Sequence, residues 1–278
     1  MSKAFLLRKA VYMGKDKLLK ELAALRIELV EQQAAADGNK VSINGAFGKF
    51  GSKWSALYSP DLLIQTTLTG QLALLMLIEA LEAAGIAVVS ANTDGVVIKC
   101  PVSKQDVMDD IVFEWETCTG FNTEATNYRA LYSRDVNNYL AFKLGGGFKA
   151  KGAYASAGLS KNPSNEICTD AVVAFLKDGT AIDDTLHACW DISRFVTIRS
   201  VKGGAIDQQG HYLGKAVRWY YSTTAQGPIR YRLNHYTVAR SDGAQALMEL
   251  PEQFPSDVDF DWYIAEAQTI LKDIGIRT

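Results

Sequence analysis

The sequence predicts an α+β protein, and three observations support this fold class. Residues 3–38 and 61–84 are rich in Leu and Ala at helical spacing. Residues 86–100 and 128–154 are instead rich in β-branched and aromatic residues and are interrupted by turn residues. Helical texture returns after residue 160, so the predicted strands lie between two helical regions.

The two helical regions before the strands differ in how clearly they are bounded. Residues 3–38 predict one or two helices, in an antiparallel pair that continues to residue 50. Residues 61–84 predict one long helix, because Ser59-Pro60-Asp61 is a helix-start signal and Gly85 is a stop signal.

The strand regions are predicted to form hairpins. Residues 86–100, IAVVSANTDGVVIKC, turn at Asn92 to Gly95, and their strands have the apolar composition of strands buried on both faces. Residues 105–117 predict a helix, and residues 128–154 predict a twisted hairpin around a glycine loop.

The rest of the chain reads as mostly helical. We expect helices at 164–178, 183–196 and 258–274, separated by a basic segment. The residue pattern changes near residues 55 and 155, so we expect domain boundaries there that divide the chain into 1–55, 56–155 and 156–278.

Composition excludes several classes of protein. An apolar fraction of 48% and a charged fraction of 22% are typical of a packed chain rather than a disordered one. The longest apolar run, Leu72 to Ile78, is followed by Glu79 and Glu82, so we expect no membrane-spanning segment, and the amino terminus shows no secretory signal. Four scattered cysteines and three histidines disfavour a zinc site and indicate reduced thiols in the cytoplasm.

The net charge of −2 conceals charge blocks of both signs. Residues 1–55 hold ten basic and five acidic side chains, and residues 194–240 hold eight and one. Residues 79–128 and 241–278 are acidic by contrast. Segregation of this kind suits a protein that presents basic surfaces to a polyanion such as nucleic acid.

The first candidate site is the segment KVSINGAFG. On a helix, Lys40, Asn44 and Phe47 share one face, which would present a cation, an amide and an aromatic ring together. Gly45 and Gly48 flank that face, and each glycine inside a helix costs about 1 kcal/mol relative to alanine. The close approach of a large flat group, such as a base pair, would explain both glycines. A solvated lysine on a helix that ends at its glycines is the simpler alternative.

The second candidate site is the turn Asn92-Thr93-Asp94-Gly95. From Ala83 to Ile98 the only charged residue is Asp94, at the tip of the predicted hairpin. A carboxylate held between apolar walls must protonate or find a cation, and hard oxygen ligands select Mg²⁺ or Mn²⁺. Ordinary turn chemistry without any metal is the alternative.

Together, the two segments resemble family B DNA polymerases. In that family motif B reads Lys-x-x-x-Asn-Ser-x-Tyr-Gly and motif C reads Asp-Thr-Asp. Here the motif B-like segment is followed by a long helix and, about 45 residues on, by Asn92-Thr93-Asp94. Asn138-Tyr139, then Lys151-Gly152, and finally DFDWYI from Asp259 resemble later family segments in the same order. The sequence SANTDGVVI is most similar to the bacteriophage branch of this family.

The resemblance implies helical fingers (1–55), an antiparallel β palm (56–155) and a mostly helical thumb (156–278). It implies template-dependent nucleotidyl transfer with Mg²⁺ or Mn²⁺, on primer-template DNA and deoxynucleoside triphosphates. Asp94 is then the metal ligand and catalytic residue. The other implied site residues are Lys40, Asn44, Phe47 and Arg8 for the nucleotide, and Asn138, Tyr139, Lys149, Lys151 and Gly152 for DNA.

The sequence departs from the family pattern in two ways. Asn92 replaces the first acid of motif C, and no segment resembles motif A, which supplies the second bridging carboxylate, or the exonuclease acids. We therefore expect a partner, an amino-terminal polymerase polypeptide with motif A and the exonuclease, as in a split gene or a longer chain. A phage-encoded protein of this kind would act in the cytoplasm of a bacterial host.

Two other functions remain open from the sequence. One is a catalytically inactive remnant of a polymerase that binds nucleic acid through its basic segments. The other is a metabolic α/β enzyme in which both motifs are coincidental; it would show no salt-dependent DNA binding.

Overall fold

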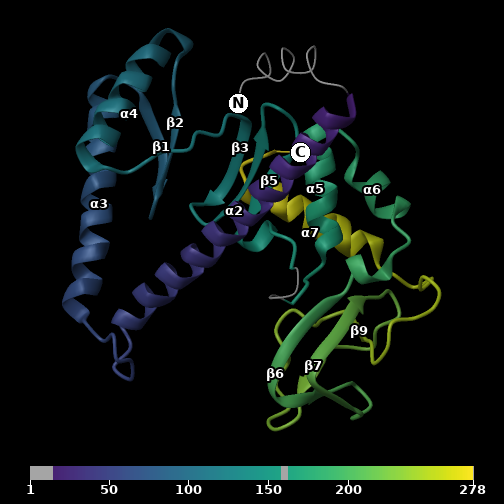
Figure 1. Cartoon of the computed structure of the whole chain (residues 1–278). Helices are drawn as coiled ribbons and strands as arrows, with labels where there is room; N and C mark the ends of the chain where they lie inside the picture. Colours follow the sequence, from purple (N-terminus) through teal and green to yellow (C-terminus); the bar gives the residue numbers. More distant parts are fainter. Residues whose placement is uncertain (1–14, 158–161, 278) are drawn as a thin grey trace. The chain divides into compact units, whose positions relative to one another are not determined.

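The computed structural model describes residues 15–157 and 162–277, and it combines helices with antiparallel sheets as predicted (Figure 1). Two compact units divide the chain, Met1–Asn122 and Thr123–Thr278. The α+β class is confirmed. The assignment of fingers, palm and thumb to residue ranges stays a prediction.

The first unit contains three α-helices, one short 3₁₀ helix and one hairpin among its described residues. In chain order its elements are α2 (Lys15–Phe50), α3 (Pro60–Ala83), β1 (Ala87–Asn92), β2 (Gly95–Lys99), the 3₁₀ helix η1 (Val102–Lys104) and α4 (Gln105–Thr119). Residues 15–50 form a single helix, so an antiparallel turn within this range is wrong, while residues 3–14 of the expected helical region lie outside the described residues.

Helix α3 begins and ends where its sequence signals indicate. The Ser59 hydroxyl accepts a hydrogen bond from the Leu62 amide, and Pro60 occupies the first turn. At the other end, the Lys104 ammonium donates to the carbonyls of Ala84 and Gly85 at 2.7 and 3.0 Å. A cation at these carbonyls complements the negative end of the helix dipole and ties η1 to α3.

The hairpin packs one face on α3 and α4. The buried centre is Leu77, Leu81 and Ile86, with Val88 and Ile98 from the strands against it, and Trp115 donates its indole N–H to the Ala73 carbonyl at 2.7 Å. Along β1 the residues alternate between exposed and half-buried. The expectation of strands buried on both faces is therefore wrong within this unit, since apolar composition alone does not say what covers the second face.

The exclusion of a membrane-spanning segment also needs correction. Helix α3 is long and apolar enough to cross a membrane by length and composition alone. Mostly buried core helices pass the same test, but only 11% of the apolar window of α3 is buried in the described structure, although Leu77 and Leu81 belong to the core of the first unit.

The second unit is built on two antiparallel sheets and three α-helices in its described part. Its first sheet has the order β3-β4-β5 and its second has the order β8-β6-β7-β9. The elements are β3 (Tyr128–Asp135), β4 (Asn138–Lys143), β5 (Phe148–Lys151), η2 (Gly152–Tyr154), α5 (Glu166–Asp178), α6 (Ile182–Ala188), η3 (Ile192–Arg194), β6 (Thr197–Ile206), β7 (Tyr212–Tyr221), β8 (Arg230–Tyr231), β9 (Ala244–Ala246) and α7 (Phe260–Asp273).

Residues 128–154 form three strands, where a single hairpin was expected. The additional turn lies at Val136-Asn137, and the Asp135 carboxylate accepts a hydrogen bond from the Asn137 amide there at 2.9 Å. Such a side-chain bond to the backbone two residues on is a turn device of Asp. The glycine loop then joins β4 to β5, as predicted.

The helix predicted at 183–196 ends early, at Ala188. The Asp191 carboxylate accepts hydrogen bonds from both the amide and the hydroxyl of Ser193, at 3.0 and 2.7 Å, and so starts the short helix η3. Asp competes for backbone donors in this way and therefore favours a new start over a continuing helix.

The sheet between residues 197 and 246 was not expected from the sequence. The pairing of β6 with β7 slips between Ser200 and Ala205, and Gly203, Gly204 and Gly214 all have positive φ. Because the slip interrupts the two-residue alternation, the strand signal of this basic segment is weak.

The hydrophobic core of the second unit contains side chains from both sheets and from helices α5, α6 and α7. Tyr263 of α7 is fully buried, and its hydroxyl donates to the Phe195 carbonyl at 2.8 Å while accepting from the Tyr221 amide at 2.9 Å. Asp259 caps α7 by accepting from the Trp262 amide at 3.0 Å. The DFDWYI segment singled out in the sequence therefore anchors a helix to a sheet.

A second anchor is the carboxylate of Asp257, and it provides a test of the fold. Burial raises the pKa of Asp257, but hydrogen bonds from Ser222, Thr224 and Tyr220 at 2.6–2.8 Å outweigh burial and hold the pKa below its usual value. A depressed carboxyl pKa stabilises the folded state above the unfolded pKa, and this contribution is lost as the pH falls through the folded pKa.

We expect Asp257→Asn to lower the free energy of unfolding by about 1–3 kcal/mol at pH 7, because hydrogen bonds to a charged group are replaced by weaker ones. The deficit should shrink as the pH falls below about 4, where the unfolded carboxyl becomes protonated, and should disappear below the lower folded pKa, where the native carboxylate is protonated as well. Urea unfolding of the second unit, followed by tryptophan fluorescence at pH 7 and below pH 4, measures the difference in the free energy of unfolding. Asp242→Asn, at an exposed site, is the control; an equal loss in both variants would contradict the expectation.

Candidate active-site hairpin and nucleic-acid interface

Asp94 occupies the tip of the β1–β2 hairpin. Asn92 pairs with Gly95, which leaves Thr93 and Asp94 as the two turn residues, and Thr93 has a positive φ of 54°. The Asp94 amide donates to the Asn92 carbonyl at 2.6 Å, and the Thr93 hydroxyl donates to the Asn92 side-chain oxygen at 3.0 Å. One backbone bond and one side-chain bond therefore stabilise the turn, and the Asp94 side chain is exposed.

The exposed position changes the argument for a metal. Apolar walls do not enclose Asp94 within the described part of the first unit, so burial does not force a cation on it. The donors at the tip, the Asp94 carboxylate and the Asn92 amide oxygen, are hard oxygens of the kind that Mg²⁺ prefers. Across residues 15–157 and 162–277 no group of three or more His, Cys, Asp or Glu side chains could hold a metal ion. Among the described residues, the hairpin tip therefore offers one carboxylate and one amide oxygen, fewer than the three ligands of such a group.

The motif B-like segment lies within α2, as expected. Asn44 and Phe47 are exposed, and Phe47 makes an edge-to-face contact with Phe50 at 6.4 Å between ring centroids. A methyl group added at Gly45 or Gly48 would meet no described atom within 4 Å. Packing within the described chain therefore does not explain either glycine, although each lowers the stability of the helix.

Not every predicted site residue can be placed in this way. Lys40 lies one turn before Asn44 in α2, while Arg8 lies outside the described residues. Asp94 belongs to the same unit as α2, but in the described residues no hydrogen bond or ring contact links Asp94 to Asn44 or Phe47. The residues predicted to hold DNA belong to the second unit.

One face of the β3–β4–β5 sheet carries lysines. Lys151 lies opposite Tyr139 in the strand register, with its ammonium 5.9 Å from the centre of the tyrosine ring, and Lys149 lies opposite Ala141. Because residues two apart share a face, Lys143 of β4 lies on the same side as Tyr139. We call Lys143, Lys149 and Lys151, all exposed, the lysine face. The strand alternation from Tyr139 could have identified Lys143 from the sequence.

Asn138 and Gly152 have a different role from the lysines. The Asn138 amide group donates to both carboxylate oxygens of Asp135 at 2.7 and 2.9 Å, and its oxygen accepts from the Ala153 amide at 2.7 Å. The hydrogen bonds from Asn138, together with that from the Asn137 amide, lower the pKa of Asp135. Asn138 thus joins the β3–β4 turn to η2 and positions Lys151 and Gly152 instead of presenting a free amide.

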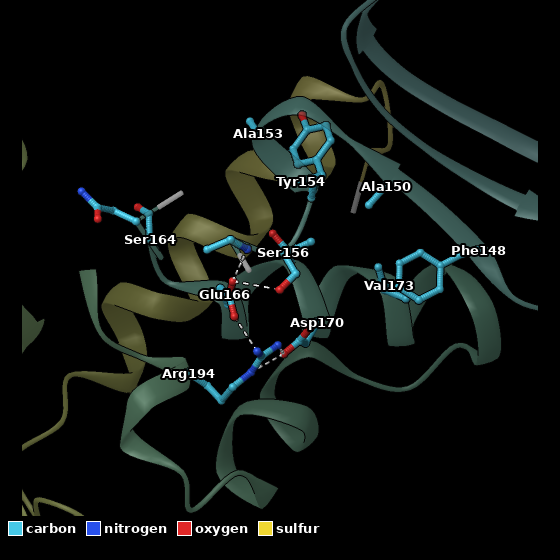
Figure 2. Close-up of a pocket in the computed structure, with 14 residues that line it drawn as sticks. Phe148, Ala150, Ala153, Tyr154, Ser156, Ser164, Glu166, Asp170, Val173 and Arg194 are labelled. Carbon is cyan, nitrogen blue, oxygen red and sulfur yellow. Dashed lines mark hydrogen bonds and ion pairs between the residues drawn. The ribbon is translucent and has the colours of Figure 1, made fainter. Parts of the chain in front are cut away.

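A pocket beside this junction contains an ion-pair network (Figure 2). Arg194 bridges Glu166 and Asp170, with its Nε 3.0 Å from the Asp170 carboxylate. Glu166 also accepts hydrogen bonds from the Ser156 hydroxyl and the Ala157 amide at 3.2 and 2.7 Å. Burial lowers the pKa of Arg194, but the two carboxylates outweigh burial and raise it. Because Arg194 is paired with both Glu166 and Asp170, the network carries no unpaired positive charge. It joins η3 and α5 to the end of η2.

Comparison with known proteins agrees with the sequence resemblance. No family model matches the chain. Over 144 residues the chain is 31% identical to DNA polymerase 1 of Aeropyrum pernix, a match that covers 51% of this chain and 14% of that protein. The fold is similar to the family B DNA polymerase of the hyperthermophilic archaeon Pyrobaculum calidifontis, with a TM-score of 0.52 at 17% identity, over 93% of this chain and 37% of that one.

The chain therefore spans a minor part of the length of both relatives. Its sequence similarity covers about half of its residues and its structural similarity nearly all of them. By sequence the chain is similar to a DNA polymerase, and its fold is similar to that of a family B DNA polymerase.

Proposed function

We propose that the chain is the carboxy-terminal part of a DNA-directed DNA polymerase, which extends a primer by template-dependent nucleotidyl transfer once a motif A-bearing part completes it. One observation supports this most directly. The first unit presents a helix with two otherwise unexplained glycines and an exposed carboxylate at a tight β-turn, in the chain order of motifs B and C. The similarity to DNA polymerases adds to this evidence.

Helix α2 is proposed to form the nucleotide site. Lys40 would neutralise the triphosphate as a point charge, with Arg8 as a second cation. Asn44 and Phe47 would lie against the sugar and the new base pair, where the ring gives a flat apolar surface. The open space beside Gly45 and Gly48 lets the base pair approach the helix backbone.

Asp94 is proposed to bind catalytic Mg²⁺ or Mn²⁺ together with a second carboxylate from outside the described residues. A divalent metal there would supply the charge that phosphoryl transfer requires. The contribution of this chain is to place Asp94 at the hairpin tip, where the bond from the Asp94 amide to the Asn92 carbonyl closes the turn.

The lysine face is proposed to contact the backbone of the primer-template duplex. Its ammonium groups are exposed, while Tyr139 adds an aromatic ring beside Lys151. Phosphate contacts of this kind position DNA without reading its sequence. Asn138 and Gly152 contribute by fixing the end of β5.

A motif A-bearing partner is proposed to complete the site, either as a separate polypeptide or as a further part of the same one. Helix α3 supports this, because it exposes a row of large apolar side chains, each at least 46% exposed: Leu62, Ile64, Leu68, Leu72, Leu75 and Met76. Contiguous exposed apolar side chains are typical of surfaces that contact another protein segment. The relatives contain much more chain than is present here, which could cover it.

Primer extension tests the proposal. The purified chain, a primed template, deoxynucleoside triphosphates and Mg²⁺ should yield little or no product. Adding the polypeptide that carries motif A, expressed from the upstream reading frame, should yield template-directed products. Robust extension by the chain alone would contradict the incomplete site, and DNA binding without synthesis in every combination would favour the inactive remnant.

A further inference from the structure

The turn that carries Asp94 is strained at the residue before it. Thr93 has a φ of 54°, in the left-handed region. Within the described part of the chain, the residues other than glycine with a positive φ are Thr93, Asn165, His235 and Arg240, and of these Thr93 is the β-branched one. Asparagine and histidine are tolerated in this region, but a β-branched residue is an outlier there. The hairpin therefore stores backbone strain at Thr93.

The hairpin does not use its own glycine to relieve this strain. Gly95 pairs with Asn92 and does not belong to the described glycines with a positive φ. Two-residue hairpin turns usually place glycine or asparagine at the position with positive φ. Thr93 is also exposed, so packing against the described core of the first unit does not hold it in this conformation. The turn itself therefore sets the conformation of Thr93.

Asn92 holds the strained turn through two hydrogen bonds. Its backbone carbonyl accepts from the Asp94 amide at 2.6 Å, which closes a three-residue turn around Thr93. Its side-chain oxygen accepts from the Thr93 hydroxyl at 3.0 Å. Because both Thr93 and Asp94 are bonded to Asn92, a change in the Thr93 conformation would move the Asp94 backbone. The side-chain bond requires an acceptor at position 92, and an amide supplies that acceptor without a second charge.

We propose that Asn92 and Thr93 are positioning residues for Asp94. The strained turn sets the direction of the Asp94 carboxylate, and Asn92 holds that turn as a hydrogen-bond acceptor. Strain that persists in an exposed turn is typical of sites where geometry matters more than stability. The inference rests on the proposed polymerase function, and it gives Asn92, which replaces an acid of the family motif, a role that needs no charge.

Two substitutions in the chain alone separate the strain from the hydrogen bond. T93V keeps the branched side chain but loses the hydroxyl, so amide hydrogen exchange along β1 and β2 should become about threefold to tenfold faster. T93N relieves the strain, because asparagine adopts positive φ at lower cost, and should leave exchange at or below the native rate. Faster exchange in T93N than in T93V would show that Thr93 stores no strain and would overturn the inference.

Primer extension by the chain together with the motif A-bearing part tests the positioning role. T93N and N92A should each lower the rate on the order of tenfold, because a reacting group that is displaced slightly loses much of its effect. Both should also raise the Mg²⁺ concentration that gives the half-maximal rate. T93S keeps the hydroxyl and should restore the native rate and Mg²⁺ requirement. T117N makes the same change at an exposed threonine of α4 and should alter neither quantity.

The positioning role and the proposed function fail in different ways. A lower rate in T93N without faster amide exchange supports positioning, because a purely structural residue would change both together. If D94N abolishes synthesis while T93N and N92A keep the native rate and Mg²⁺ requirement, the proposed function stands and this inference fails. If D94N itself retains full synthesis, Asp94 is not a metal ligand and both fail.

Discussion

Replacing Asp94 with Asn should reduce DNA synthesis by the completed enzyme about 10³-fold, since a metal ligand supplies several kcal/mol of transition-state stabilisation and each 1.4 kcal/mol is tenfold in rate. Duplex affinity should stay within about twofold, because Asp94 lies at a hairpin tip of the first unit whereas the lysine face lies in the second. The rate of primer extension with the motif A-bearing partner and the anisotropy of labelled duplex measure the two effects.

The fold should tolerate this change. The Asp94 side chain is exposed, and Asn is itself a favourable turn residue. Asp106→Asn, at an exposed position in the first turn of α4, removes the same charge from the same unit and should leave synthesis unchanged. Full synthesis by Asp94→Asn would show that the hairpin carboxylate is not a metal ligand.

Replacing Gly152 with Ala should have the largest effect on the second unit. Gly152 has a φ of 68°, and an added Cβ would overlap the Asn137 carbonyl oxygen and the Asn138 side-chain oxygen. Left-handed backbone strain and overpacking together are expected to cost about 2–4 kcal/mol. Since the clash separates η2 from the β3–β4 turn, Lys151 should move and duplex affinity should fall with stability.

Amide hydrogen exchange in β4 and β5 measures the local loss, and duplex anisotropy measures its consequence. Gly179→Ala is the matched control, because Gly179 has a similar φ of 75° but no atom within 4 Å of an added Cβ. The control isolates backbone strain, about 1 kcal/mol. Equal effects at the two glycines would show that the junction with Asn137 and Asn138 is not tightly packed.

The local elements were predictable where residues signal them directly. The start of α3 at Ser59-Pro60 and the turn between Asn92 and Gly95 follow from side chains that act on their own backbone. The β6–β7 sheet was not predictable in this way, because its register slips at Gly203 and Gly204 and conceals the strand period. The early end of α6 likewise depends on the competition for hydrogen bonds near Asp191.

The candidate site likewise has features that the sequence could predict and features that it could not. Spacing alone identified Asn44 and Phe47 on one helix face and Asp94 in a turn, and the structure agrees with both placements. Spacing could not show that Asp94 is exposed, or that the Asn138 side chain is committed to Asp135 and Ala153. Those facts depend on cross-strand neighbours far apart in the chain.

By itself, the sequence determined the α+β class, the order of its chemical motifs and the blocks of charge along the chain. Tertiary structure decided which of those charges are used internally and which remain available: Arg194 and Arg240 are paired with acids of α5 and α7, while Lys202, Lys215 and Arg218 face outward. The physical reason is that a periodic pattern depends on neighbours in sequence, whereas the partner of a charged group is chosen by packing between distant segments.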